Sequence, residues 1–240
     1  MPEVVESEAP AVVHTRPKPV APWPHTVFLL IVLALWGIYG ALHWRLLLTA
    51  MPRVVVYANH IVLQSLLVGA TIAGLYHRRE FIGGALSKIT ARDLAGDAGR
   101  GLLIYLGASV AIILIAILIR PLHLSHQKAA VEALLPHTFG ELALWMVVSL
   151  AAGCCEEFVF RGYLLRQMES WFGNVWVAVG ASALLFGCMH FYEGSAAVFE
   201  IGGLGLVYGV VAVRQGNLRT VMFAHFLQDA LAGLFLYLRR

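Results

Sequence analysis

Three short groups of polar residues lie in or beside strongly apolar runs in the second half of the chain. In chain order they are Glu156-Glu157-x-x-x-Arg161, Phe186-x-x-x-His190 and His225-x-x-x-Asp229. An ionisable side chain inside a membrane costs a few kcal/mol or more, so its presence needs a chemical or structural reason. Carboxylates can serve as general bases and histidines can donate or accept protons. These residue types could therefore hydrolyse a bond.

Helical spacing sorts these side chains by face. Residues four positions apart lie on one face of a helix, so Glu157 can pair with Arg161. His225 and Asp229 share a face for the same reason. Glu156 is one position earlier than Glu157, is turned by about 100° and faces elsewhere. A single ion pair or a single membrane histidine is often only a packing contact, but three polar groups on three helices are harder to explain in that way.

The three groups can also lie at a similar depth. If the chain turns near residues 172–174, Glu156 and His190 lie at comparable distances along the two antiparallel helices on either side of the turn. His225 follows a second expected turn, near residue 215, by about ten residues, which places it roughly 15 Å into an apolar core of about 30 Å. We therefore expect Glu156, His190 and His225 to converge.

These polar groups interrupt a chain of 240 residues that is otherwise strongly apolar. Hydrophobic residues make up 60% of the sequence and charged residues 13%, against roughly 45–50% and 25% in soluble proteins. This composition argues against a water-soluble domain. A net charge of +3 without a basic stripe predicts no nucleic-acid partner, and three cysteines are too few for a disulfide framework.

Seven stretches have, or approach, the length of about 20 apolar residues that a membrane-spanning helix needs. They are residues 27–48, 54–76, 101–119, 142–160, 175–189, 197–213 and 218–238. The sustained alternation of a membrane barrel is missing from them. The sequence therefore predicts an all-α fold, a polytopic transmembrane helical bundle of about seven to eight helices, and a multi-pass protein of the cell (inner) membrane that contacts membrane lipids.

The first 25 residues differ from the rest of the chain. They hold six of the nine prolines and three glutamates, a composition typical of a disordered, partly extended tail. Residues 26–240 are then predicted to form the transmembrane bundle. The long acidic start and the span-length apolar run argue against a cleaved signal peptide, so we expect the first span to stay as an anchor.

Positive charges predict how the bundle is oriented. The expected loop between the second and third spans carries five basic residues, which are Arg78, Arg79, Lys88, Arg92 and Arg100. Cytoplasmic loops are enriched in Lys and Arg, so this loop and the N-terminus are predicted to be cytoplasmic. Seven crossings would leave Arg239-Arg240 outside. An eighth membrane segment near residues 129–139 or 162–172 would return the C-terminus to the cytoplasm.

On the three motifs, the chain resembles the CAAX prenyl endopeptidase and bacteriocin-processing family of intramembrane proteases, also called the Abi family. The family pattern is Glu-Glu-x-x-x-Arg, then Phe-x-x-x-His, then His-x-x-x-Asn or Asp. The order of the motifs here is the same, and each ends or crosses an apolar run. The resemblance covers roughly residues 90–238, so the tail and the first span lie outside it.

The resemblance implies an intramembrane endopeptidase that hydrolyses peptide bonds of membrane-associated proteins or peptides, with prenylated CAAX-type proteins among the candidates. It implies that Glu156 is the general base that activates water and that His190 orients or polarises this water. His225 and Asp229 would then face the developing oxyanion. A further implication is that the helix carrying Glu156 is braced by Glu157 and Arg161.

Two features leave the chemistry open. Many family members carry Asn where this chain has Asp229, which can accept a hydrogen bond from His225 or Arg161 or stay protonated. Glu156, His190 and His225 also form a two-histidine, one-carboxylate set of the kind that holds catalytic zinc, as in a metalloprotease. Because the sequence has no His-Glu-x-x-His helix, we favour a metal-free mechanism with no required cofactor and keep zinc as the alternative.

Two other functions compete with proteolysis. A membrane protein of the same fold could bind peptides or confer immunity to bacteriocin-type peptides without hydrolysing them. A small transporter could use the polar groups as an ion path. There is, however, no obvious inverted repeat between the two halves, and almost all charge within the spans lies in the second half.

Overall fold

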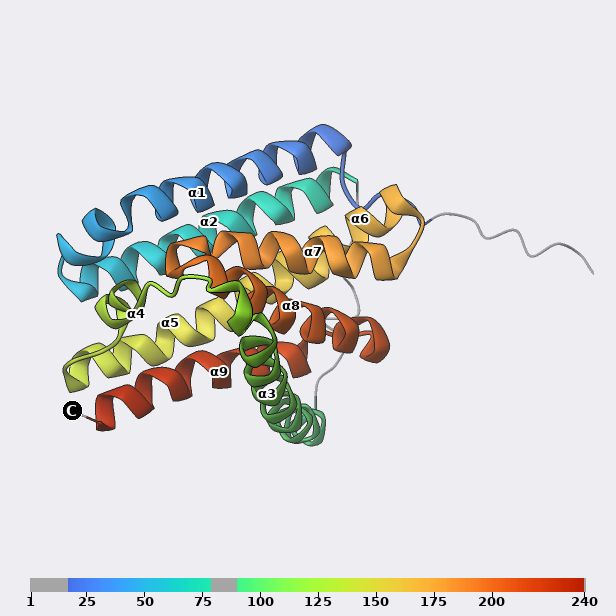
Figure 1. Ribbon diagram of the computed structural model, residues 1–240. Coiled ribbons are helices and arrows are strands. Elements are labelled where there is room, and N and C mark those ends of the chain that lie inside the picture. Colours follow the sequence, from blue (N-terminus) through green and yellow to red (C-terminus); the bar gives the residue numbers. More distant parts are fainter. Residues whose placement is uncertain (1–16, 79–89, 240) are drawn as a thin grey trace, which may run out of the picture.

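The computed structural model describes residues 17–78 and 90–239, and every regular element in these two ranges is helical (Figure 1). The α-helices are α1 (Trp23–Thr49), α2 (Arg53–His77), α3 (Ala91–Ile119), α4 (Lys128–Leu134), α5 (Phe139–Glu157), α6 (Leu165–Phe172), α7 (Val175–Met189), α8 (Ser195–Gln215) and α9 (Arg219–Leu238). Three short segments join them, namely η2 (Arg120–Leu122), the π-helical η3 (Phe158–Leu164) and η4 (Phe191–Glu193). The predicted all-α bundle is confirmed.

Among the described residues, six helices are long and apolar enough to cross a membrane. They cover Trp23–Trp44, Arg53–His77, Arg92–Leu122, Phe139–Phe172, Ser195–Gln215 and Arg219–Leu238. Their outward faces carry large apolar side chains, such as Leu118 and Leu42, which are exposed in the protein itself. Such surfaces require lipid, so the chain is an integral membrane protein. The seventh predicted stretch forms α7, which is apolar but has only 15 residues and packs against α6 and α8.

The fourth span is one continuous helix made of α5, η3 and α6. The π-helical segment begins directly after Glu157, and widened turns of this kind are often found at functional sites. Residues 162–172 therefore extend the fourth span, and α4, with seven residues, is too short to cross a membrane. Neither segment adds the eighth crossing considered from the sequence. In Figure 1 the end of α9 and the start of α1 lie at opposite ends of the bundle.

Each of the three motif-bearing helices takes part in a close crossing at a glycine. A side chain at Gly153 of α5 would meet the backbone of α9, at 2.8 Å from the Met222 carbonyl oxygen and 2.9 Å from the Phe226 nitrogen. A side chain at Gly187 of α7 would meet the backbone of α8 at the Val198 carbonyl oxygen. Only glycine allows these backbones to approach so closely, so the sequence itself sets how near α5, α7 and α9 can lie to their neighbours.

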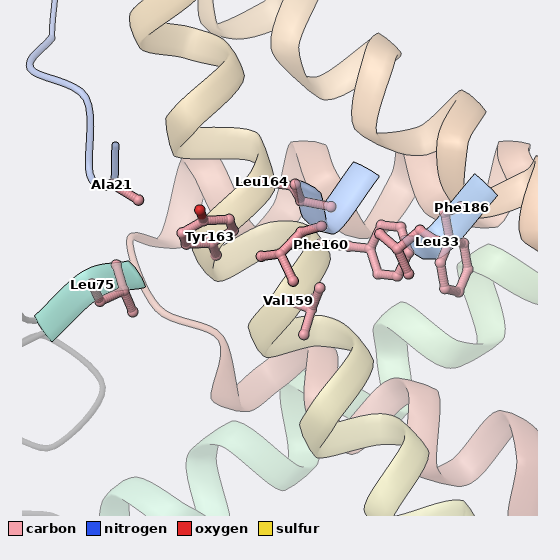
Figure 2. Packing of buried hydrophobic residues seen from close by; sticks show 9 residues of the cluster. Ala21, Leu33, Leu75, Val159, Phe160, Tyr163, Leu164 and Phe186 are labelled. Atoms are coloured by element: carbon pink, nitrogen blue, oxygen red, sulfur yellow. The ribbon is translucent and has the colours of Figure 1, made fainter. Parts of the chain in front are cut away.

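One apolar cluster joins the fourth span to the N-terminal helices. Figure 2 shows Val159, Phe160 and Tyr163 of the π-helical segment with Leu33 of α1 and Leu75 of α2. The Phe160 ring meets the ring of Phe186 on α7 at a centroid distance of 5.0 Å and an interplanar angle of 73°. The segment that follows Glu157 is therefore fixed by packing on several sides.

The chain just before α1 is held by hydrogen bonds to α6. The buried Gln167 accepts from the Val20 and Ala21 amides and donates to the Ala21 carbonyl oxygen. Ala21 is buried. Of the predicted tail, residues 1–16 lie outside the described residues, as do Arg79 and Lys88 of the predicted cytoplasmic loop.

Candidate active site

Glu157 and Arg161 form a buried ion pair. The Arg161 Nη1 nitrogen lies 2.9 Å from the Glu157 Oε1 oxygen. The Arg161 side chain is 1% exposed and the Glu157 side chain 0%. The predicted pairing along one helical face is confirmed, although the π-helical turn widens the helix between the two residues. Both charges are removed from water, so each one needs the opposite charge of its partner to offset the desolvation free energy.

The same Glu157 oxygen also holds the histidine of α9. The Nδ1 nitrogen of His225 lies 2.8 Å from Glu157 Oε1. A carboxylate only accepts hydrogen bonds, so Nδ1 carries the proton and donates it. Glu157 therefore connects two spans, and it fixes the ring so that Nε2 points away from it.

Glu156 lies on the other side of His225. Its Oε2 oxygen is 3.9 Å from His225 Nε2, and its Oε1 oxygen accepts a hydrogen bond from the side-chain amide of Gln64 on α2. The Glu156 side chain is 13% exposed, against 0% for Glu157. The two neighbouring glutamates thus differ in environment, and Glu156 is the more exposed of the two.

Asp229 completes the group around His225. Its Oδ2 oxygen lies 3.6 Å from His225 Nε2, and one third of its side chain is exposed. Of the two partners considered for Asp229 from the sequence, His225 is the neighbour, while Arg161 is paired with Glu157. The backbone of Asp229 is tied to α5, because the Trp145 indole donates to its carbonyl oxygen at 2.9 Å.

His190 follows the last residue of α7 as its C-cap and joins the group through Phe186. Its Nδ1 nitrogen donates to the Phe186 carbonyl oxygen at 2.9 Å, so in the neutral ring Nε2 is left as an acceptor. The Phe186 ring, which is 1% exposed, lies 4.9 Å from the His190 ring and 6.0 Å from the His225 ring between centroids. Arg161 stacks over the same ring at 4.3 Å. The three motifs therefore meet around one buried aromatic side chain.

Two neighbours of the group were not assigned a role from the sequence. Gln64 of α2 contacts Glu156 directly and contacts His60 at 3.3 Å between the Nε2 nitrogens. Gln64 and His60 are polar residues in an apolar span. The free-energy cost of placing polar side chains inside a membrane was the signal that could have identified them. The third member of this environment is Tyr192 of η4, where burial and the negative charges of Glu193, Glu156 and Asp229 raise the pKa of the phenol well above its usual range.

The three side chains considered as zinc ligands are not arranged as a metal site in the structure. Within residues 17–78 and 90–239, no three His, Cys, Asp or Glu side chains are arranged to hold a metal ion. The zinc set of Glu156, His190 and His225 is therefore not matched by a ligand geometry, and we derive no step through a metal ion.

A comparison with protein families identifies the helices that carry this group. Residues 138–231 match the family model described as type II CAAX prenyl endopeptidase, Rce1-like. The matched range begins at Thr138, the N-cap residue of α5, and ends within α9. It contains all three motifs. No curated protein and no solved structure showed significant similarity to the chain.

Proposed function

We propose that this chain, whose residues 138–231 form an Rce1-like type II CAAX prenyl endopeptidase domain, is an intramembrane endopeptidase that uses Glu156 as its general base. The family match supports an intramembrane protease as the general class. One observation carries the assignment of the site. His225 lies between Glu156 and Asp229 on its Nε2 side and is fixed by the buried Glu157 on its Nδ1 side.

Glu156 removes a proton from water in the proposed reaction. The water oxygen forms a bond to the carbonyl carbon of the peptide, and the carbonyl becomes a tetrahedral oxyanion. The proton on Glu156 then passes to the peptide nitrogen as the carbon–nitrogen bond breaks. The products are a carboxyl group and an amine, and Glu156 returns to its ionised form. Atoms and charges balance without a cofactor.

The two histidines have different tasks in this scheme. Nδ1 of His190 is engaged by a carbonyl oxygen, so its Nε2 can accept a hydrogen bond from the attacking water and orient it. His225 Nε2, when it carries a proton, is the donor for the oxyanion, because Glu157 holds the ring from the opposite nitrogen. Asp229 orients the Nε2 side of His225, and Glu157 with Arg161 braces the helix that carries Glu156.

Substrates are proposed to be membrane-associated proteins or peptides. The family name supports prenylated CAAX-type proteins as the first class to test. A partly exposed Asp229 beside the buried His225 gives the group access from outside the helix core. We propose a place in the cell membrane with the N-terminus on the cytoplasmic side, for which the basic residues near α2 and α3 are the support.

Quantitative proteomics of protein termini tests the function. Membranes from cells that express the wild type are compared with those that express Glu156→Gln at equal abundance. The control is Glu169→Gln, which changes a partly exposed glutamate of α6. The proposal expects new termini with the wild type and the control, and none with Glu156→Gln.

The purified protein provides the second arm. Reconstituted wild type is incubated with farnesylated and unmodified peptides that end in a CAAX sequence. Cleavage that survives Glu156→Gln contradicts the assignment of the base. If the folded wild type binds these peptides but leaves them intact, and no new termini form in cells, the fold serves binding or immunity.

A further inference from the structure

Gln64 lies on α2, outside the residues that match the family, yet it contacts the glutamate proposed as the base. Its Nε2 nitrogen donates to Glu156 Oε1, across 92 positions of sequence. The Gln64 side chain is 7% exposed. None of the three motifs includes a residue of α2, so this contact adds a further membrane-spanning helix to the group.

The orientation of the Gln64 amide follows from its partners. A carboxylate oxygen only accepts, so the atom that faces Glu156 must be the nitrogen. The same nitrogen faces His60 Nε2 at 3.3 Å, and this ring nitrogen can accept. The amide oxygen of Gln64 is buried and has no hydrogen-bond partner within the described residues. The donor end of the amide is therefore committed to the carboxylate, and its acceptor end is free beside it.

We infer that Gln64 is a positioning residue for the hydrolysis proposed above, acting by holding the Glu156 carboxylate in one orientation. The inference rests on the proposed function, because it assigns Gln64 a part in the same reaction. With Oε1 held by Gln64, the second oxygen, Oε2, is directed to the side of His225 Nε2, where the oxyanion donor lies. Without this bond the carboxylate can rotate away from the attacking water, and such misplacement costs about 10- to 100-fold in rate.

Another buried polar residue of α2 provides the matched control. Thr71 is 0% exposed, but its hydroxyl donates to the Leu67 carbonyl oxygen of its own helix at 2.9 Å. Thr71→Val therefore removes a buried hydroxyl from the same span without touching Glu156. Gln64→Met keeps the length and approximate shape of the side chain and removes both polar atoms.

Steady-state kinetics of the full-length protein in proteoliposomes test the inference, with a farnesylated, internally quenched CAAX peptide as the probe. Rates are expressed per amount of folded protein. Monodispersity and melting temperature are measured to show that each variant is folded. We expect Gln64→Met to lower kcat about 10- to 100-fold with KM changed less than about twofold. Thr71→Val should leave both constants within about twofold of the wild type. A kcat for Gln64→Met within twofold of the wild type, or an equal loss in both variants, overturns the inference.

Infrared spectroscopy provides a readout that does not depend on activity. The Glu156 carboxylate band is isolated as the difference between a protein and its Glu156→Gln variant, once in the wild-type background and once in the Gln64→Met background. A shift of the band between the two backgrounds is expected, because one carboxylate oxygen loses its donor. An unchanged band overturns the inference even if the wild type cleaves the peptide. If the wild type does not cleave, the proposed function fails, and the band still decides whether Gln64 holds Glu156.

Discussion

His225 is held by Glu157 rather than by the neighbouring Glu156. Its Nδ1 nitrogen lies 2.8 Å from Glu157 Oε1, whereas its Nε2 nitrogen lies 3.9 Å from Glu156 Oε2. The Glu157 oxygen that accepts from His225 is the one that Arg161 contacts at 2.9 Å. Glu157 thus supports Glu156 in two ways. It neutralises the buried Arg161, and it orients the His225 ring so that Nε2 is the nitrogen nearer to Glu156.

The first prediction concerns the stability of this buried pair. Glu157→Ala leaves the Arg161 guanidinium buried without a counter-charge, which costs about 3–5 kcal/mol of unfolding free energy. In the double variant Glu157→Gln/Arg161→Met the charge is gone, and the amide oxygen can still accept from His225. We expect most of the stability to return in the double variant. Denaturant titration in detergent measures both, and a double variant no more stable than Glu157→Ala would contradict this reading of the pair.

A second prediction concerns Asp229. A carboxylate 3.6 Å from His225 Nε2 opposes a developing negative charge nearby, whereas an amide could donate to it. Asp229→Asn is therefore expected to keep or raise kcat. Asp229→Ala removes the side chain that orients the Nε2 side of His225 and offers no donor in its place, so it is expected to lower kcat about tenfold or more. The two variants are compared on the same peptide at equal abundance. Equal tenfold losses would show that the negative charge itself is required.

Removal of metal ions gives the third prediction. The proposed reaction uses Glu156 and His225 without a metal ion, with Gln64 and Glu157 holding these two side chains in place. Peptide cleavage is therefore expected to be unchanged after treatment with a strong zinc chelator. Elemental analysis of the purified protein should find less than one zinc ion per chain. Loss of cleavage on chelation, with recovery on addition of zinc, would overturn the metal-free mechanism.

The sequence predicted the helical bundle and the order of its parts because both depend on local signals. Apolar runs of sufficient length identified the spans, and the four-residue spacing identified the pair of Glu157 with Arg161. The π-helical segment was not predicted, because the apolar residues that form it have no distinguishing period. Residues 162–172 were not recognised as the continuation of the fourth span, because Arg166, Gln167 and Glu169 interrupt the apolar run there.

The contacts between helices were only partly predictable. The convergence of the three motifs was predicted from the similar depth of their residues in the membrane. Phe186, which all three motifs contact in the structure, already belonged to one of the motifs. The bonds from His225 to Glu157 and from Gln64 to Glu156 were not predicted, because they depend on the rotation and tilt of each helix. Rotation and tilt are set by close crossings, such as those at Gly153 and Gly187, and no short sequence pattern encodes them.

The fourth prediction tests one of these crossings. Gly187→Ala places a methyl group against the backbone of α8, 2.9 Å from the Gly202 Cα, and overpacking of this kind costs about 1–3 kcal/mol. The matched control is Gly180→Ala in the same helix, where nothing lies within 4 Å of the added atom. We expect Gly187→Ala to lower the melting temperature and to reduce cleavage, because His190 ends the displaced helix. The control should be as stable as the wild type or slightly more stable. Equal melting temperatures for the two variants would contradict the crossing.

The fifth prediction tests how the chain before α1 is attached to the domain. Gln167, which is 0% exposed, accepts from the Val20 amide at 2.9 Å and from the Ala21 amide at 3.1 Å. Gln167→Leu removes both acceptor contacts, and each buried amide left without a partner costs about 1–3 kcal/mol. The segment should therefore detach, and hydrogen exchange at Val20 and Ala21 should become fast. Arg166→Ala, which changes an exposed neighbour in the same helix, should leave the exchange slow. Continued protection of both amides in Gln167→Leu would show that packing of the buried Ala21, rather than the side-chain amide, holds the segment in place.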